Sequence, residues 1–208
     1  IKKSSIFELF MESAVLRLTK DALFLDRDGV INVDYGYVYQ RKNFHPIEGI
    51  FDLVKLSNTL GLLVVVITNQ SGIARGYYTE DEFKDFSKWI LNIFKKNDAI
   101  IDSVYYSPYH PTKGIGKYKI DENTRKPRPG MILKAARELK INLKRSILIG
   151  DKVTDLYAAN AAGVGTKVYY QPFESQCLDK NLGFKFTTIS SLASAEDILR
   201  RNKSRWQA

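Results

Sequence analysis

The chain has 208 residues, 44% of them hydrophobic and 12% aromatic, which is enough for one domain with a substantial core. The formal net charge is +9 at pH 7, and the single cysteine, Cys177, excludes a disulfide framework and a thiolate zinc cluster. No apolar run is long enough to cross a membrane, and the first residues lack the apolar segment of a secretory signal, so we expect a cytoplasmic protein with no membrane partner.

Strand-like and helix-like patterns alternate along the chain. Apolar runs predict strands at residues 22–25, 62–67, 101–106, 146–149 and 166–170. Helices are predicted after Thr79 (an N-cap before an acidic first turn), at Pro129, near Lys152 and over residues 191–200. Gly163 is expected to end the helix that begins near Lys152. The alternation predicts an α/β fold with a central parallel sheet and helices on both faces.

We expect three parts along the chain: an N-terminal extension over residues 1–20, one domain over residues 21–175, and a C-terminal segment over residues 176–208 that packs on the domain or trails from it. Residues 107–126 interrupt the alternation, since they are polar and show no clear period. A loop of that length in a compact domain is usually functional or mobile.

The excess of positive charge fits more than one kind of partner. The basic residues are scattered, with local clusters at residues 125–128 and 200–205. A nucleic-acid surface needs a continuous basic stripe, whereas a small anionic substrate explains the first cluster equally well and the second is expected to be a solvated tail. We therefore expect a monomer with a small-molecule substrate and no nucleic-acid partner.

Two carboxylates lie one residue apart directly after the apolar run of residues 22–25. Burying a charge without a partner is costly, so each of them needs a cation or a function. Ligands of open α/β sheets bind at the carboxyl ends of the strands. We therefore interpret Asp26 as a nucleophile and Asp28 as its acid/base neighbour.

Three other polar groups stand at the ends of predicted elements: residues 68–72 after the second strand, Arg125 and Lys126 before the helix at Pro129, and Gly150, Asp151 and Lys152, with Asp155, after the fourth strand. If the strands are neighbours in a parallel sheet, all these groups meet at one edge. Taken separately, residues 68–72 also fit a strand-ending turn, and Asp151 with Asp155 fits a helix cap.

The side chains of these groups are chemically complementary. Three acidic groups with no protein cation would repel one another, and Mg²⁺, which takes hard oxygen ligands, would resolve that repulsion. The Thr68 hydroxyl and the Asn69 amide can donate hydrogen bonds to phosphoryl oxygens, and a lysine can neutralise the charge that builds on them. The pattern therefore predicts Mg²⁺-dependent chemistry on a phosphate.

In this order the motifs resemble the haloacid dehalogenase (HAD) superfamily of phosphatases. The matching positions are Asp26 and Asp28 for its DxD motif, Thr68 for its strand-two threonine, Lys126 for its lysine, and Gly150, Asp151 and Asp155 for its GDxxxD motif. The resemblance implies a HAD-like, Rossmann-like three-layer fold and an aspartyl-phosphate mechanism. In that mechanism Asp26 is phosphorylated, and Asp28 protonates the leaving oxygen and then activates water. Mg²⁺ would be held by Asp26, Asp151 and the backbone carbonyl of Asp28.

Longer runs narrow the resemblance to the D-glycero-D-manno-heptose 1,7-bisphosphate phosphatases: DRDGVINVDYGYV, VITNQSGIARG, RKPRPGM, GDKVTD and AAGVGTKV. Histidinol-phosphate phosphatase domains share much of this pattern, which covers residues 22–171. The resemblance implies hydrolysis of one phosphate of a heptose 1,7-bisphosphate, in the synthesis of nucleotide-activated heptose for lipopolysaccharide, capsule or glycan. Histidinol phosphate or another small phosphomonoester is the alternative substrate, and a nucleic-acid 3′ end is a third.

The resemblance also implies a substrate site: Asp34, Tyr35, Gly36, Tyr37, Asn69, Gln70, Ser71, Arg125 and Lys152. Arg125 would recognise the second phosphate or the sugar, while Thr68, Lys126 and Lys152 would stabilise the transferred phosphoryl group. The segments between the motifs are too short for a large cap domain, so selectivity would come from residues 33–44 and 107–126. The tyrosines at positions 35, 37 and 109 fit sugar contacts and loop packing equally.

The loop over residues 107–126 departs from the resembling family, whose members usually hold a structural zinc there. Its ligand positions are taken here by Ser107, Tyr109, Glu122 and Thr124. One glutamate with the neighbouring His110 does not make a four-ligand zinc site. We therefore expect no structural Zn²⁺, and we interpret His110 as a hydrogen-bonding residue of the loop.

Overall fold

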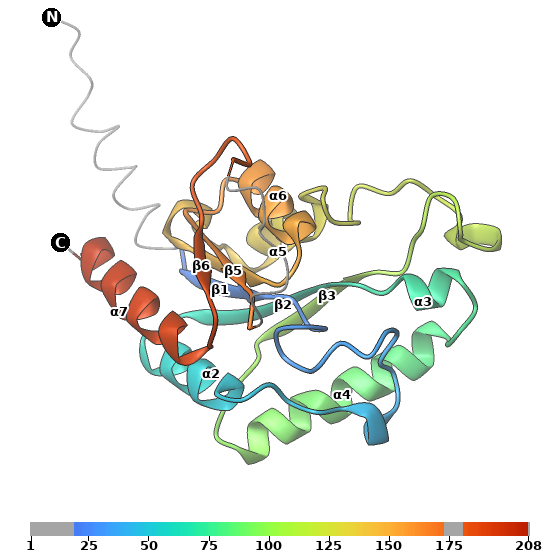
Figure 1. The fold of residues 1–208 in the computed structure, drawn as a ribbon, viewed down its shortest axis with the longest axis horizontal. Helices are drawn as coiled ribbons and strands as arrows, with labels where there is room; N and C mark the ends of the chain where they lie inside the picture. The colour runs from blue at the N-terminus through green and yellow to red at the C-terminus, as the bar shows by residue number, and fades with distance from the viewer. Residues whose placement is uncertain (1–18, 173–180, 208) are drawn as a thin grey trace, which may run out of the picture.

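A six-stranded parallel sheet forms the centre of the computed structural model, which describes residues 19–172 and 181–207 (Figure 1). Its strand order is β3-β2-β1-β4-β5-β6, and every neighbouring pair is parallel. The strands are β1 (Ala22–Leu25), β2 (Leu63–Asn69), β3 (Ser103–Ser107), β4 (Ile147–Gly150), β5 (Thr166–Tyr170) and β6 (Thr187–Ile189). The predicted parallel sheet is confirmed.

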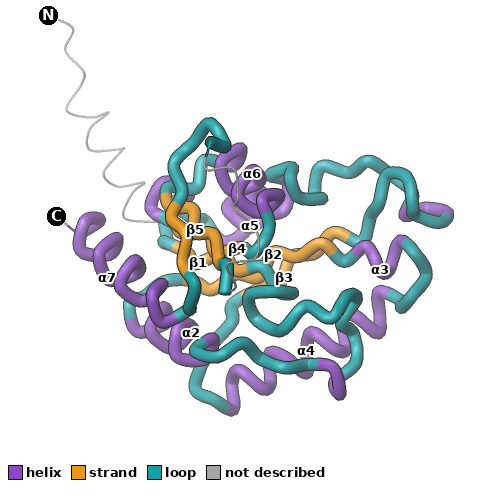
Figure 2. The backbone as a smooth tube through the Cα atoms, viewed as in Figure 1, coloured by secondary structure: helices purple, strands orange, loops and turns teal. Residues whose placement is uncertain are grey.

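Helices cover both faces of the sheet. Each strand contributes to the core on both faces, because its successive side chains point to opposite sides. Leu23 and Leu25 of β1 pack in one core with α2 (Ile50–Thr59), α4 (Glu80–Lys96) and α7 (Ala193–Gln207). Ala22 and Phe24 pack in a second core with α5 (Gly130–Leu139) and α6 (Val153–Ala162). Figure 2 shows the two sets of helices on either side of the strands. The expected three-layer fold is confirmed.

The segments between the strands carry no large cap within the described residues. Between β1 and β2 lie a loop, the 3₁₀ helix η1 (Arg41–Asn43) and α2. The short helix α3 (Ser71–Ala74) and α4 lie between β2 and β3. The 3₁₀ helix η2 (Gly116–Tyr118) is the regular element of the long loop, and η3 (Leu143–Arg145) precedes β4. Loops and short helices, rather than a cap domain, therefore border the carboxyl ends of the strands.

Helix α4 begins at the predicted N-cap. The Glu82 amide donates to Thr79 Oγ1 at 3.1 Å, and the Thr79 amide donates to the Glu82 carboxylate at 2.7 Å. This capping box satisfies two N–H groups that the helix itself leaves unpaired. Gly163 ends α6 in the left-handed conformation, as expected.

The sequence prediction missed helix α2 and strand β6, besides the short helix α3 and the 3₁₀ helices. Helix α2 buries Ile50, Leu53 and Val54 at helical spacing, but it follows Gly49, so the usual polar N-cap signal is absent. Strand β6 has three residues, of which two are exposed, so it carries almost no apolar pattern. The last helix is also longer than predicted, Ala193–Gln207 rather than residues 191–200.

The C-terminal segment completes the sheet, since β6 pairs with β5 and α7 packs against α2. Of the expected N-terminal extension, residues 1–18 lie outside the described residues, as do residues 173–180 with Cys177, and Ala208. Among the described helices, none combines the length and the apolar character that a membrane span requires.

The strand order decides where the polar groups meet. Strand β1 lies between β2 and β4, and Leu25 pairs with Val66 on one side and with Ile149 on the other. The residues that follow these three strands therefore leave the sheet at the same edge, which is where ligands bind in folds of this class.

Candidate active site

A cleft of about 440 Å³ opens at the carboxyl ends of β1 and β2. Its lining holds most of the predicted site residues: Asp26, Asp28, Asp34, Gly36, Tyr37, Thr68, Asn69, Gln70, Ser71, Arg125, Lys126 and Lys152, with Asp155. Two predicted residues are not among the lining residues. Asp151 has a carboxylate oxygen within 4.8 Å of those of the lining residues Asp26 and Asp155. Tyr35 is 61% exposed, and its ring packs edge-on against His45. A larger hollow of about 740 Å³ beside β5, β6 and α7 contains none of the predicted residues.

Asp26 and Lys126 form a buried ion pair at the base of the cleft. Lys126 Nζ lies 2.9 Å from Asp26 Oδ1 and 2.6 Å from Asp155 Oδ1, and it donates to the Ile67 carbonyl at 3.0 Å. Burial alone would lower the pKa of Lys126, but Asp155 and Asp26 raise it, so the lysine is a cation. Its three contacts fix that charge beside Asp26, where charge on a phosphoryl group would develop.

The pKa of Asp26 is raised to about 7. Burial is the main cause, the carboxylates of Asp155 and Asp151 add to it, and Lys126 opposes it. Burial also raises the pKa of Asp151 to about 6, with Lys152 opposing and Asp155 adding. Burial disfavours the charged form of both carboxyl groups, so a cation bound beside them would favour their ionised state.

The acidic residues at the base of the cleft fit a divalent cation. Asp26, Asp151 and Asp155 each offer one oxygen, and these atoms lie within 4.8 Å of one another. Asp151 Oδ1 is buried and accepts no hydrogen bond from any described residue. Gly29, at φ 95°, permits this approach, because a Cβ there would meet Asp151 Oδ2 at 2.1 Å. Hard oxygen donors of this kind suit Mg²⁺.

Asp155 has two partners of its own within this group. One carboxylate oxygen contacts Lys126 Nζ, and the other accepts from the backbone N–H of Lys152 at 3.0 Å. The helix-cap interpretation therefore holds for Asp155, which also orients the buried lysine. Asp151 keeps an oxygen for a cation.

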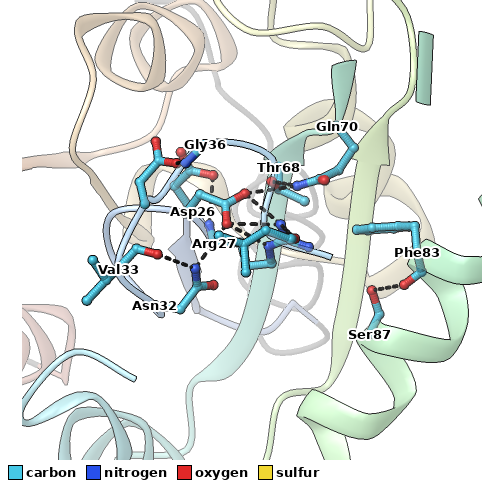
Figure 3. A network of polar contacts seen from close by, with 12 residues as sticks. Asp26, Arg27, Asn32, Val33, Gly36, Thr68, Gln70, Phe83 and Ser87 are labelled. Atoms are coloured by element: carbon cyan, nitrogen blue, oxygen red, sulfur yellow. Dashed lines mark hydrogen bonds and ion pairs between the residues drawn. The ribbon is translucent and has the colours of Figure 1, made fainter. Parts of the chain in front are cut away.

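Asp28 is held by three side chains. Arg27 makes a two-pronged ion pair with it, with Nη2 2.7 Å from Oδ2 and 2.9 Å from Oδ1, while Asn32 Nδ2 donates at 3.0 Å and Gln70 Nε2 at 3.1 Å. These three donor residues are labelled in Figure 3. Arg27 is itself 2% exposed and lies over the rings of Phe83 and Phe86. The expectation that no protein cation serves these acidic groups is wrong, because Arg27 and Lys126 are both buried among them. The DxD pattern gave no indication that the residue between the aspartates folds back onto the second.

The end of β2 supplies Thr68, Asn69 and Gln70 to the cleft. Asn69 exchanges two hydrogen bonds with the backbone of Lys126: its Nδ2 donates to the carbonyl at 3.1 Å and its Oδ1 accepts from the amide at 3.0 Å. Gln70 Nε2 donates to Thr68 Oγ1 at 2.8 Å. Asn69 therefore links the long loop to the sheet and positions Lys126. Its side-chain amide is hydrogen-bonded to the Lys126 backbone.

The loop after β1 brings Asp34 to Lys152 across the cleft. Lys152 Nζ donates to Asp34 Oδ2 at 2.9 Å, and the Gly36 amide donates to Asp34 Oδ1 at 2.9 Å. Burial alone would raise the pKa of Asp34, but the hydrogen bond and the charge of Lys152 lower it. Tyr37 follows at φ 55° and turns its ring edge-on to Tyr77, 4.7 Å away. The predicted substrate loop, residues 33–44, thus contacts the N-terminus of α6 through the Asp34–Lys152 ion pair.

Arg125 lines the cleft, and Arg75 lies close to it. Arg125 donates to the Tyr109 carbonyl at 3.2 Å, and the pKa of Arg125 is lowered by burial and then by the nearby Arg75. The Arg75 guanidinium lies 5.7 Å from the Tyr37 ring centroid, and its Nε is buried without a hydrogen-bond partner. Neither arginine forms an ion pair with any residue that the structure describes. Sequence reasoning missed Arg75, although the run VITNQSGIARG contains it.

The long loop is tied down by side-chain hydrogen bonds. The Tyr106 and Tyr118 hydroxyls both donate to Glu80 of α4, at 3.0 and 2.8 Å. Thr124 Oγ1 donates to the buried Ser107 Oγ at 3.3 Å, so two of the substituted ligand positions lie in contact. His110 Nδ1 accepts from the amides of Lys113 and Thr112, which confirms its interpretation as a loop hydrogen bonder.

Known proteins resemble the chain over most of its length. A family model described as HAD-hydrolase-like matches residues 123–170. The D-glycero-alpha-D-manno-heptose-1,7-bisphosphate 7-phosphatase of Burkholderia mallei is 51% identical over 145 residues, 70% of this chain and 77% of that protein. The D-glycero-beta-D-manno-heptose-1,7-bisphosphate 7-phosphatase of Vibrio cholerae is 48% identical over 151 residues, 73% of this chain and 81% of that protein.

Two solved phosphatase structures are also similar to this chain. A HAD-like phosphatase from Mesorhizobium loti matches with a TM-score of 0.79 at 33% identity, covering 89% of this chain and 87% of that one. The D,D-heptose 1,7-bisphosphate phosphatase from B. bronchiseptica, complexed with magnesium and phosphate, matches with a TM-score of 0.74 at 25% identity, covering 87% and 98%.

Proposed function

Because this chain belongs to the HAD-like D-glycero-D-manno-heptose-1,7-bisphosphate 7-phosphatases, we propose that it hydrolyses the 7-phosphate of a heptose 1,7-bisphosphate through Asp26. One observation carries the proposal: the buried Asp26–Lys126 pair lies at the base of a cleft that Arg125 also lines, and Arg75 lies close to Arg125, with neither arginine in an ion pair with a described residue. The first pair suits the transferred phosphoryl group and the second suits a remote phosphate.

The reaction proceeds in two steps at Asp26. A carboxylate oxygen of Asp26 bonds to phosphorus while the bond from phosphorus to the sugar oxygen breaks, and Asp28 gives its proton to that oxygen. Asp28 then takes a proton from water, whose oxygen bonds to phosphorus as the bond to Asp26 breaks. Inorganic phosphate leaves and both carboxyl groups return to their starting state.

Charge on the transferred group is balanced by residues already fixed in place. Lys126 has its ammonium group held by three acceptors, and Thr68, near the end of β2, lines the same cleft. Prepositioned donors of this kind need no reorganisation during the reaction. Asp26, Asp151 and the backbone carbonyl of Asp28 would hold Mg²⁺, which supplies positive charge next to the phosphoryl oxygens.

Arg125 is proposed to recognise the second phosphate, with Arg75 beside it. A planar guanidinium suits two-pronged binding of phosphate, and neither arginine has a competing carboxylate in the described residues. A bisphosphate would gain a contact that a monophosphate lacks. Histidinol phosphate would bind without it.

A substrate panel with two arginine variants tests the proposal. Both heptose 1,7-bisphosphate anomers, histidinol phosphate, a 3′-phosphorylated oligonucleotide and p-nitrophenyl phosphate are compared by kcat/KM. Arg125→Ala should raise KM for the bisphosphate by about 10- to 100-fold, the range of a hydrogen bond to a charged group, and leave p-nitrophenyl phosphate turnover unchanged. Arg128→Ala is the matched control, because Arg128 is exposed and pairs with Asp121 instead. A chain that prefers histidinol phosphate, or the oligonucleotide, contradicts the proposed substrate.

A further inference from the structure

Gln70 is buried at the end of β2, and its amide is used entirely inside the protein. It is 2% exposed. Its Nε2 donates to Thr68 Oγ1 at 2.8 Å (Figure 3). The same nitrogen donates to Asp28 Oδ2 at 3.1 Å. Both N–H groups of the amide are therefore committed, and they link the phosphoryl-binding hydroxyl to the acid/base carboxylate.

Each of these two bonds has a consequence for its acceptor. Thr68 Oγ1, by accepting from Gln70, keeps its own hydroxyl proton for a phosphoryl oxygen. Asp28 is held on one side by Gln70 and on the other by Arg27 and Asn32, so its carboxylate has one orientation. Both effects require that the Gln70 amide presents nitrogen, not oxygen, to the cleft.

Tyr78 fixes that choice. Its hydroxyl donates to Gln70 Oε1 at 2.6 Å. If the amide were reversed, Oε1 would face the Asp28 carboxylate and the Tyr78 hydroxyl would lose its acceptor. Burial is the largest cause that raises the pKa of Tyr78, so the hydroxyl remains protonated and available as the donor.

The surrounding packing holds Tyr78 at this place. The ring is 4% exposed and stacks on Tyr39, with centroids 4.6 Å apart. Gly72 leaves the space that the ring occupies, because a Cβ at that position would meet Tyr78 Cε1 at 2.2 Å. A side chain at position 72 would therefore displace the hydroxyl from Gln70.

We propose that Tyr78 is a positioning residue of the phosphatase reaction, which acts by fixing the Gln70 amide toward Asp28 and Thr68. The inference rests on the proposed roles of Asp28 and Thr68. It assigns Gln70 to the orientation of these two residues rather than to contact with the sugar.

A double-mutant cycle tests this inference with a matched control. Tyr78→Phe removes one hydroxyl and keeps the ring, and it should lower kcat by about tenfold, the upper range for one hydrogen bond, with KM within about twofold. Tyr39→Phe removes a hydroxyl from the same stack without touching Gln70, and it should leave both constants unchanged. On a Gln70→Ala background, Tyr78→Phe should have no further effect, because coupled residues are not additive.

The outcomes separate this inference from the proposed function. Activity in the unmodified chain, with wild-type kcat in Tyr78→Phe, would overturn the positioning role alone. An equal kcat loss in Tyr78→Phe and Tyr39→Phe, or the same loss with and without Gln70, would show that the ring stack matters only structurally and would also overturn it. An unmodified chain that hydrolyses no phosphate ester would overturn both proposals. Thermal unfolding of each variant checks that the fold is retained.

Discussion

Asp26→Asn should abolish turnover and, at high pH without metal, stabilise the protein. An amide cannot form the acyl phosphate, so the first step is lost. Burial raises the pKa of Asp26 to about 7, so ionisation of this carboxyl group costs stability in the folded chain. Asparagine has nearly the same shape and no charge, and it keeps an oxygen for the Arg27 amide that now donates to Asp26 at 2.7 Å.

The sign and size of the effect follow from linkage. A group whose pKa is higher in the folded state contributes stability that is fully present below its unfolded value and is lost as the pH rises through its folded value. For Asp26 that window runs from 3.8 to about 7. About three pH units at about 1.4 kcal/mol each give a loss of up to about 4 kcal/mol. Lys126 keeps Asp155 at 2.6 Å in the variant, so no buried lysine is left without an anion.

Urea unfolding in EDTA at pH 5 and pH 8 measures the difference. The stability advantage of Asp26→Asn should grow by about 3 kcal/mol between these pH values, and Mg²⁺ should reduce it, because the metal binds the carboxylate and not the amide. Asp85→Asn, on the exposed face of α4, is the control for charge removal. A variant no more stable than the unmodified protein at pH 8 in EDTA would refute the electrostatic argument, and retained turnover would refute the assignment of the nucleophile.

Three further predictions concern the acid/base group, the metal and the long loop. Asp28→Asn should slow kcat by about 10²–10⁴-fold, the usual contribution of a general acid–base group, and a smaller loss would assign that role elsewhere. EDTA should abolish turnover and Mg²⁺ restore it, with Asp151→Asn requiring more Mg²⁺ for half-maximal activity; full activity in EDTA would contradict the metal site. Elemental analysis should find less than one zinc per chain, since Ser107 and Thr124 stand at ligand positions, and a stoichiometric, tightly held zinc would overturn this.

The sequence was sufficient for five of the six strands and for most residues that follow them at the carboxyl edge, because both depend on local patterns. Apolar runs mark buried strands, and a polar side chain directly after such a run, as at Asp26 or Thr68, needs a reason to be there. The contacts of Arg27 have no such signal. In the sequence it is a charged residue between two others, and its burial depends on Phe83 and Phe86 of a helix more than fifty residues later.

Tyr78 illustrates the same limit at longer range. It lies in the turn before α4, and its bond to Gln70 requires the chain to reverse over α3 and requires Gly72 to leave room for the ring. The pattern of apolar residues in the sequence does not indicate such a reversal of the chain. The pairing of Asp155 with Lys126 was likewise hidden, because both residues also fit their motifs without touching each other.

The formal charges of the cleft agree with a substrate that carries two phosphates. Five carboxylates lie around its base and near wall, at positions 26, 28, 34, 151 and 155, and three cations contact them, Arg27, Lys126 and Lys152. With all five carboxyl groups ionised, before Asp28 takes up the proton that it donates, the shortfall of two positive charges equals the charge of one Mg²⁺. Arg75 and Arg125 stand outside this balance, since they have no carboxylate partner in the described residues. With the base of the cleft neutral, the positive charge of Arg125 faces the cleft unopposed and that of the nearby Arg75 adds to it, which favours a second phosphate dianion over the uncharged end of a monophosphate.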